Sequence, residues 1–476
     1  MAVQRIKLIL ILFFIPYCII AQEEWSLEKC ISYALENNIQ IKQQELNAQY
    51  SENNLLQSKL NILPTLNGYA MYQSNFGTTV DPFTSSFTPN NVQSGNVSLS
   101  STMTLFNGFQ KYNTIKQSKF DLLASIQDVE KMKNDISLNI ASAYLQILFN
   151  LELAEIAKNQ IAITEQQVDR TRKMVNAGSL AKGSLLEVEA QEASEELQYV
   201  NAKNQLDISY LNLIQLLDLD STQSISFEIE KPLLPEIKEQ ELHISIEDIY
   251  MEAVDTLPQI KSAEYKLKSA EKGLAIAQGS RSPRLSANAT WWASGYSSAL
   301  GMPDLTTLSM DTMISGFTSS GEDVYAYDYN YDTKPVSLTD QFSDNKSTSF
   351  SVSLSIPIFN NWQVSNAVSN AKINLLNQQY QLESTRNMLL KEIQQAHADA
   401  VAALKKFQAS RKALSSIEEA FHYTQEKFNV GLVSSVDYNL SKSQLTKARS
   451  DLLQAKYEYI FKTKILDFYM GKSIKL

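Results

Sequence analysis

Two stretches of the chain alternate strictly between apolar and small polar residues. In residues 350–358 every second side chain is apolar, and Ser351, Ser353 and Ser355 lie between them. Residues 97–105 show a similar alternation, with serine and threonine at the intervening positions. Because successive side chains of a strand point to opposite faces of its sheet, each stretch predicts a strand with one apolar and one hydroxyl-rich face. The apolar positions are Val97, Leu99, Met103 and Leu105 in the first strand, and Phe350, Val352, Leu354 and Ile356 in the second.

Most of the remaining chain is typical of helix. No glycine or proline occurs from Phe109 to Ala177, or between Pro357 and Gly431, so each run predicts a helix of about 100 Å. Gly178 and Gly431 then mark reversals of the chain, since glycine readily adopts the positive φ of a helix end. We expect return helices from Ser184 and from Leu432. The second has the apolar spacing of a coiled-coil seam, at Leu445, Ala448, Leu452, Ala455 and Tyr459.

The first and second halves of the chain are similar to each other in sequence. At an offset of 219, residues 26–70 align with residues 245–289 without a gap, and beyond the predicted strands the offset becomes 253. We therefore predict two tandem repeats, 22–235 and 236–476. Each has a helix, a β-hairpin (66–105 or 285–358) and a long helical hairpin, turning at 178–183 or at 431. The extra length of the second repeat lies in the polar segment 293–349, which we expect to be a long exposed loop.

Composition excludes several functions. The formal charge is −10 and no basic run occurs, which argues against a nucleic-acid partner. Residues 1–21 have the basic start, apolar run and small final residue of a secretory signal peptide, and the expected mature chain then contains Cys30 alone. The three histidines lack metal-ligand spacing, so we predict no metal and no cofactor. The GxxxxG spacing from Gly178 has Ser184 where a phosphate loop needs lysine, and no other catalytic motif predicts an enzyme.

Strands of eight to ten residues suit a bilayer, but four of them per chain cannot close a barrel. Open edges in lipid would leave unpaired backbone groups, each at a cost of several kcal/mol. The pattern thus predicts that several copies share one barrel, three giving twelve strands and two giving a narrow eight. Aromatic residues lie at the predicted strand ends, as membrane interfaces favour; these are Tyr72, Trp291, Trp292, Phe106, Phe109, Phe359 and Trp362. The edge of a soluble β-sandwich would also alternate.

Together, the duplication, the strand exits "LFNGFQ" and "IFNNWQ", and the turns "NAGSLAKGSLLEVEAQ" and "NVGLVSSVDYNLSKSQ" resemble the family of TolC-like outer-membrane efflux proteins. The resemblance implies a mixed α and β membrane fold: a homotrimer whose twelve-stranded barrel lies in the outer membrane of a Gram-negative bacterium and continues as a periplasmic α-helical barrel. It implies an exit duct for a tripartite efflux pump or a type I secretion system. The alternative is a periplasmic coiled-coil adaptor or structural scaffold, which would need no lipid-facing strands.

The resemblance also assigns roles at the helix turns. A membrane-fusion adaptor protein, linked to an inner-membrane transporter, would dock on Gly178, Ser179, Leu180, Val430, Gly431 and Leu432. Asp437 would contribute to an acidic tunnel constriction, and Ser184 occupies the equivalent position in the first repeat. Leu440 and Val433 stand where relatives have a further acid and a tethering base. We therefore do not expect charge pairing to hold this entrance closed.

Overall fold

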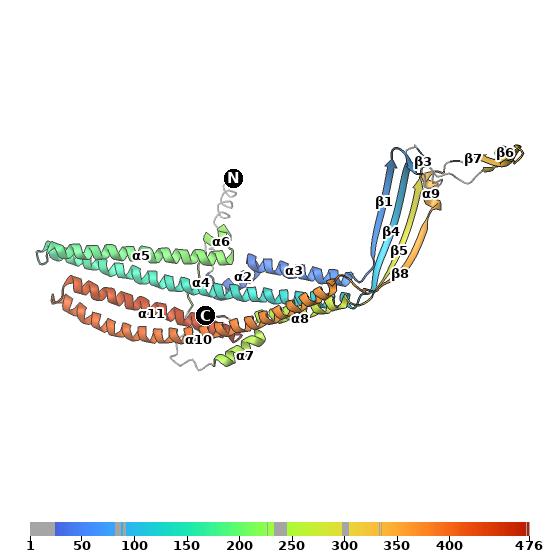
Figure 1. Cartoon of the computed structure of the whole chain (residues 1–476). Helices are drawn as coiled ribbons and strands as arrows, with labels where there is room; N and C mark the ends of the chain where they lie inside the picture. The colour runs from blue at the N-terminus through green and yellow to red at the C-terminus, as the bar shows by residue number, and fades with distance from the viewer. Residues whose placement is uncertain are drawn as a thin grey trace, which may run out of the picture. The chain divides into compact units, whose positions relative to one another are not determined.

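The computed structural model describes residues 24–80, 87–88, 92–225, 227–232, 245–297, 304–332, 334, 336–472 and 474–475. The predicted signal peptide and the predicted repeat boundary at 235–236 lie outside these residues. The chain divides into two units (Figure 1). A helical unit contains Met1–Asn53, Lys119–Ser269 and Leu376–Leu476, and a sheet unit contains Asn54–Ser118 and Ala270–Leu375.

Two long helical hairpins dominate the helical unit. They are formed by α4 (Gln110–Asn176) with α5 (Lys182–Leu217), and by α10 (Gln363–Asn429) with α11 (Ser435–Tyr469) (Figure 1). The helices α4 and α10 have 67 residues each and lie where the runs without glycine or proline predict them. The other helices that lie wholly or partly in this unit are α2 (Leu27–Asn37), α3 (Ile39–Leu60), α6 (Ser221–Ile225), α7 (Ile246–Thr256) and α8 (Pro258–Gly279). One end each of α3, α4, α8 and α10 belongs to the sheet unit.

Both return helices begin at residues other than those predicted. Helix α5 begins at Lys182, two residues before Ser184. Helix α11 begins at Ser435 and not at Leu432. The reason is that Leu432 still belongs to the turn, where its backbone N–H donates to the carbonyl of Lys427 at 2.9 Å and closes the end of α10.

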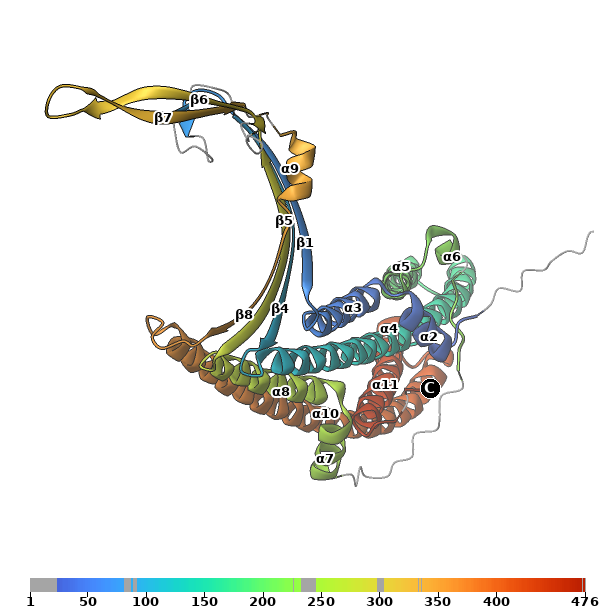
Figure 2. The ribbon, with the colours of Figure 1, turned by 90° about the vertical axis from the view of Figure 1, so that its right-hand side faces the viewer.

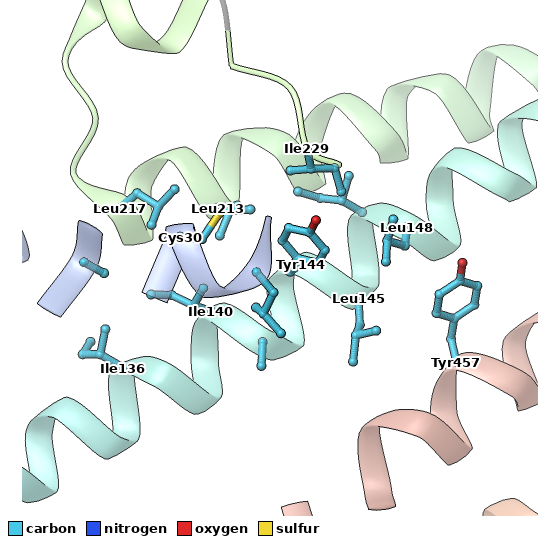
Figure 3. Close-up of a cluster of buried hydrophobic side chains, with 14 of the residues drawn as sticks. Cys30, Ile136, Ile140, Tyr144, Leu145, Leu148, Leu213, Leu217, Ile229 and Tyr457 are labelled. Carbon is cyan, nitrogen blue, oxygen red and sulfur yellow. The ribbon is translucent and has the colours of Figure 1, made fainter. Parts of the chain in front are cut away.

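The largest core of the helical unit surrounds the middle of α4. Side chains of Ile136, Ile140, Tyr144 and Leu148 pack against α2, α5 and the segment near Ile229 (Figure 3). Among the described residues, α4 is the one helix long and apolar enough to cross a bilayer, yet its apolar residues line this core. A second core joins α7, α8, α10 and α11 and contains Ile249, Ile260, Leu389, Ile393 and Leu466.

Cys30 belongs to the core around α4. Its side chain is fully buried beside Tyr144 and Leu213 in the α4 core (Figure 3). Burial raises the pKa of the Cys30 thiol to about 12, so the reactive thiolate is scarce at neutral pH. This cysteine therefore acts as a small apolar packing group.

The sheet unit is built on four antiparallel strands in the order β1-β4-β5-β8 (Figures 1 and 2). Their bounds are β1 Thr65–Asn75, β4 Val92–Phe106, β5 Arg284–Tyr296 and β8 Ser347–Ser355. Strand β8 ends at Ser355, so the predicted strand positions Ile356 and Ile358 lie beyond it. Pro357 has no N–H to donate to a neighbouring strand, which explains why the alternating pattern outlasts the pairing.

The strand register gathers the apolar residues of all four strands on one side, which we call the apolar face. Leu99 lies opposite Trp291 and Gly68, and Val352 lies opposite Ala287. The face contains Leu66, Ala70, Val97, Leu99, Met103, Leu285, Ala287, Ala289, Trp291, Phe350, Val352 and Leu354. A register shift between Thr104 and Phe106 leaves Leu105 without a partner on β5 and places Phe106 opposite Leu285. The other side is mostly serine, threonine and asparagine, with Tyr69, Met71 and Trp292 among them.

The segment expected to be a loop, 293–349, has secondary structure of its own. It contains the hairpin of β6 (Asp304–Phe317) and β7 (Asp323–Asp332), followed by the helix α9 (Leu338–Asp344). The prediction overlooked the alternation of Tyr325, Tyr327 and Tyr329 with smaller residues, a strand pattern. Gln341 of α9 holds the end of β5, since its amide accepts from the N–H of Tyr296 at 2.8 Å and donates to the carbonyl of Tyr296 at 2.7 Å. The segment between β1 and β4 contains the short strands β2 (Thr79–Val80) and β3 (Phe87–Thr88).

Candidate functional site

The turn between α4 and α5 depends on Gly178. Its φ of 76° lies in the left-handed region that favours glycine. The N–H of Gly178 donates to the carbonyl of Val175 at 3.0 Å, and that of Ser179 to Met174 at 2.9 Å. These two bonds form a Schellman motif, which satisfies the last carbonyls of α4 and reverses the chain.

The turn between α10 and α11 repeats this geometry. Gly431 has a φ of 79°, and its N–H donates to the carbonyl of Phe428 at 3.1 Å. A Cβ atom at Gly178 or at Gly431 would meet nothing within 4 Å. The backbone conformation, and not a lack of space, therefore requires glycine at both turns.

The helices that follow the turns are capped differently. The Ser434 hydroxyl accepts from the backbone N–H of Asp437 at 3.2 Å and donates to the Asp437 carboxylate at 2.7 Å. In α5 the cap residue is Ala181, which makes no side-chain bond, and Ser184 stands in the place of Asp437. Asp437 thus has a local structural role at the start of α11, in addition to the constriction role that the resemblance assigns.

Apolar side chains surround both turns and are open to solvent. Val430 and Leu432, next to Gly431, are 71% and 76% exposed. Leu180, Leu186, Val436 and Leu440 are also exposed. We call these six apolar residues, together with Gly178, Ser179 and Gly431, the tip surface. Burying one leucine is worth about 1.5–3 kcal/mol, so this cluster is a surface on which a partner could gain binding energy.

Polar contacts connect the two helical hairpins beside the turns. The Ser435 hydroxyl donates to the Glu187 carboxylate at 2.5 Å, which joins α11 to α5. Arg170 donates to the Asn429 side chain at 3.3 Å, which joins α4 to α10. In the parts of the chain that the structure describes, Asp437 forms no salt bridge.

A buried ion pair joins three helices farther from the turns. The Lys442 ammonium of α11 lies 3.3 Å from the Glu195 carboxylate of α5, and both side chains are 4% exposed. Glu195 also accepts from Gln191 at 2.8 Å and from the hydroxyl of Thr164 on α4. Burial lowers the pKa of the Lys442 ammonium, and the neighbouring Glu195 carboxylate opposes that shift.

The sequence predictions did not include this pair, although a signal was present. Lys442 lies three residues before Leu445, in line with the apolar seam predicted for α11. A charged residue in an apolar stripe indicates a buried partner. The partner itself is 247 residues away in the sequence, and helical spacing gives no means of finding it.

The predicted membrane-facing residues lie on the open sheet. Val97, Leu99, Phe350, Val352 and Leu354 occupy the apolar face and are exposed in the single chain, and Met103 lies on the same face. The edge strands β1 and β8 each have one side without a partner strand among the described residues. Within the same residues, no group of three or more histidine, cysteine, aspartate or glutamate side chains could hold a metal ion.

Comparison with known proteins agrees with these features. A family model described as outer membrane efflux protein matches residues 30–218 and 249–472. Outer membrane protein TolC of Escherichia coli strain K12 is 24% identical to the chain over 346 residues. These residues are 71% of the chain and 62% of TolC, so the chain spans less than two thirds of that relative.

Solved structures share the fold. The CmeC outer membrane channel of Campylobacter jejuni has a TM-score of 0.74 at 17% identity, covering 94% of this chain and 86% of CmeC. The outer membrane protein VceC of Vibrio cholerae also has a TM-score of 0.74, at 14% identity, covering 94% of this chain and 96% of VceC. At such identities the likeness concerns the fold alone.

Proposed function

Because the chain belongs to the outer membrane efflux protein family, we propose that it forms the exit duct of a tripartite efflux pump or a type I secretion system. Membership of the family confirms the identification made from the strand-exit and turn motifs, and the expected location in the outer membrane of a Gram-negative bacterium. The duct would act as a passive conduit for small molecules or polypeptides and not as an enzyme.

One observation supports this proposal most directly: a four-stranded sheet with an apolar face, an opposite polar face and two edges that have no partner strand among the described residues. A sheet that faces lipid on one side and water on the other has this composition. The alternative, a periplasmic adaptor or scaffold, gives no reason for exposing Phe350, Val352 and Leu354 together.

The need to pair the outer edges of the sheet supports a homotrimer. The backbone groups on the outer sides of β1 and β8 need partners in a bilayer, and in lipid these partners must be other strands. If β8 of one copy pairs with β1 of the next, three copies give twelve strands. Two copies would give eight, which leaves little room for a lumen.

The order of the elements supports the two tandem repeats. Two helices, two paired strands and a long helical hairpin follow one another as α2, α3, β1, β4, α4, α5, and again as α7, α8, β5, β8, α10, α11. In the trimer, such repeats would give the helical barrel six similar hairpins. The barrel would then present both kinds of turn at its periplasmic end.

The tip surface is the proposed docking site for a periplasmic membrane-fusion adaptor, which would connect the duct to an inner-membrane transporter. Its glycines hold tight turns, and Leu180, Val430 and Leu432 offer apolar area. Asp437 is exposed at the start of α11, next to this surface, and three copies around one axis would form the acidic constriction.

Fractionation with a transport assay tests the proposal. We expect the chain in the outer-membrane fraction of a density gradient, as a trimer that resists dissociation by detergent. Cells lacking it should retain a fluorescent efflux dye, and restoring the gene should restore export. Recovery of the chain as a soluble periplasmic protein would instead support the scaffold alternative.

A further inference from the structure

The hairpin of β6 and β7 is a feature that the duct function does not use. Its strands pair with each other and with no other strand in the described residues (Figures 1 and 2). A two-stranded hairpin is marginally stable alone in water. An additional partner surface would therefore stabilise it.

One side of this hairpin is aromatic. The register places Tyr325 opposite Ile314, Tyr327 opposite Thr312, and Tyr329 opposite Met310, and residues that lie opposite each other share a side of the sheet. All three tyrosines are more than half exposed, and Tyr327 is 63% exposed. We call these six residues the tyrosine face. The opposite side contains Asp311 directly across from Asp328.

The hairpin is also strongly acidic. From residue 304 to residue 332 the sequence has no lysine, arginine or histidine, and its acidic residues are Asp304, Asp311, Glu322, Asp323, Asp328 and Asp332. Since two carboxylates directly across a strand pair repel each other, this hairpin gains stability from any cation that approaches it. The Asn330 amide reaches the Asp311 carboxylate at 3.3 Å and offsets the repulsion only in part.

We propose that the tyrosine face docks a basic polypeptide segment, rich in arginine or lysine, that approaches from outside the cell. Tyrosine rings attract cations on their faces, and the surrounding carboxylates supply a long-range field of matching sign. A second copy of this chain would bring the same acidic hairpin, and an anionic lipid surface would be repelled. The location outside the cell rests on the proposed function, whereas the binding does not.

Binding to the purified full-length protein in a non-ionic detergent tests this inference. The probe is a fluorescein-labelled peptide of nine arginines, followed by fluorescence anisotropy, with a peptide of nine glutamates as the reference. We expect the arginine peptide to bind and the glutamate peptide not to bind. The triple variant Tyr325→Ser/Tyr327→Ser/Tyr329→Ser should weaken binding of the arginine peptide at least tenfold. This variant keeps every charge, so the loss would report on the tyrosine face and not on the general field.

Tyr380→Ser is the matched control, because Tyr380 is also well exposed but lies on α10. It should leave the affinity unchanged. Equal affinity of the wild type and the triple variant would overturn the proposal. So would tyrosine-dependent binding of maltoheptaose or of phosphatidylcholine vesicles without binding of the arginine peptide. Dye export by the triple variant should stay normal, so failure of this inference is distinguishable from failure of the duct proposal.

Discussion

Single replacement of Glu195 or Lys442 should destabilise the helical unit strongly. Both side chains are buried and form an ion pair with each other. Glu195 also accepts a hydrogen bond from Gln191, and Lys442 also donates one to Thr164. Removing one member of a buried ion pair leaves a charge without compensation, which costs about 3–5 kcal/mol. An exposed pair contributes about 0–1 kcal/mol.

We therefore predict that Glu195→Gln lowers the urea midpoint of helix unfolding, followed by far-UV circular dichroism in detergent. Asp135→Asn is the control, since it removes the same charge from the exposed pair of Lys131 and Asp135 on α4. That variant should unfold like the wild type. The double variant Glu195→Leu/Lys442→Met should recover much of the loss, because an apolar pair needs no compensation. Equal midpoints for Glu195→Gln and Asp135→Asn would show that the buried pair does not stabilise the unit.

At the scale of elements, β8 offers a direct test of which face meets lipid. Val352 lies on the apolar face opposite Ala287, and Ser353 lies on the other face opposite Ser286. An arginine facing lipid near the middle of the bilayer costs about 2–4 kcal/mol, while one in a water-filled lumen costs much less. We predict that Val352→Arg reduces the yield of assembled trimer strongly and Ser353→Arg only mildly, measured on unheated gels. Equal losses would contradict the proposed orientation of the sheet.

The turn between α10 and α11 is the second element to test. Leu432→Asp places a charge where the proposed adaptor interface excludes water, so we expect export to be lost while the trimer remains intact. Leu197→Asp makes the same change at an exposed position on α5, away from the turns, and should leave export normal. Crosslinking to the adaptor should fail in the Leu432 variant alone. Normal export by the Leu432→Asp variant would contradict the proposal that the adaptor docks on the tip surface.

Sequence patterns predicted the elements well where one physical constraint dominates. The alternation in residues 97–105 and 350–355 and the runs without glycine or proline each correspond to an element of the structure. The predicted strand residues were wrong where the alternation of side chains and the pairing of the backbone disagree. Ile356 continues the alternation, but Pro357 ends the pairing, and the register shift at Leu105 changes which residue joins the apolar face. The β6–β7 hairpin was missed because its acidic and polar composition resembles that of a loop.

At the scale of the whole molecule, the sequence led to the family because the motifs at the strand exits and turns are local. Long-range contacts such as that of Lys442 with Glu195 leave only a weak local signal, and they could not be predicted. Strands β1 and β8 have no partner on their outer sides among the described residues, so the proposed barrel would need several chains together. The proposed constriction needs residues from several copies, so its role must be tested in the assembled channel.

In the proposed trimer, three Asp437 carboxylates would form a ring around the tunnel axis. Like charges held close to one axis attract cations and repel anions, so the open channel should prefer cations. We expect Asp437→Asn to shift the reversal potential in a salt gradient toward zero in bilayer recordings. The asparagine side chain can still accept the bond from the Ser434 hydroxyl, and the backbone N–H of residue 437 still donates to that hydroxyl, so this variant separates the charge from the cap. Asp451→Asn, which removes an exposed charge from the same helix, should leave the reversal potential unchanged. If Asp437→Asn also leaves it unchanged, Asp437 does not line the constriction and its role is confined to the helix cap.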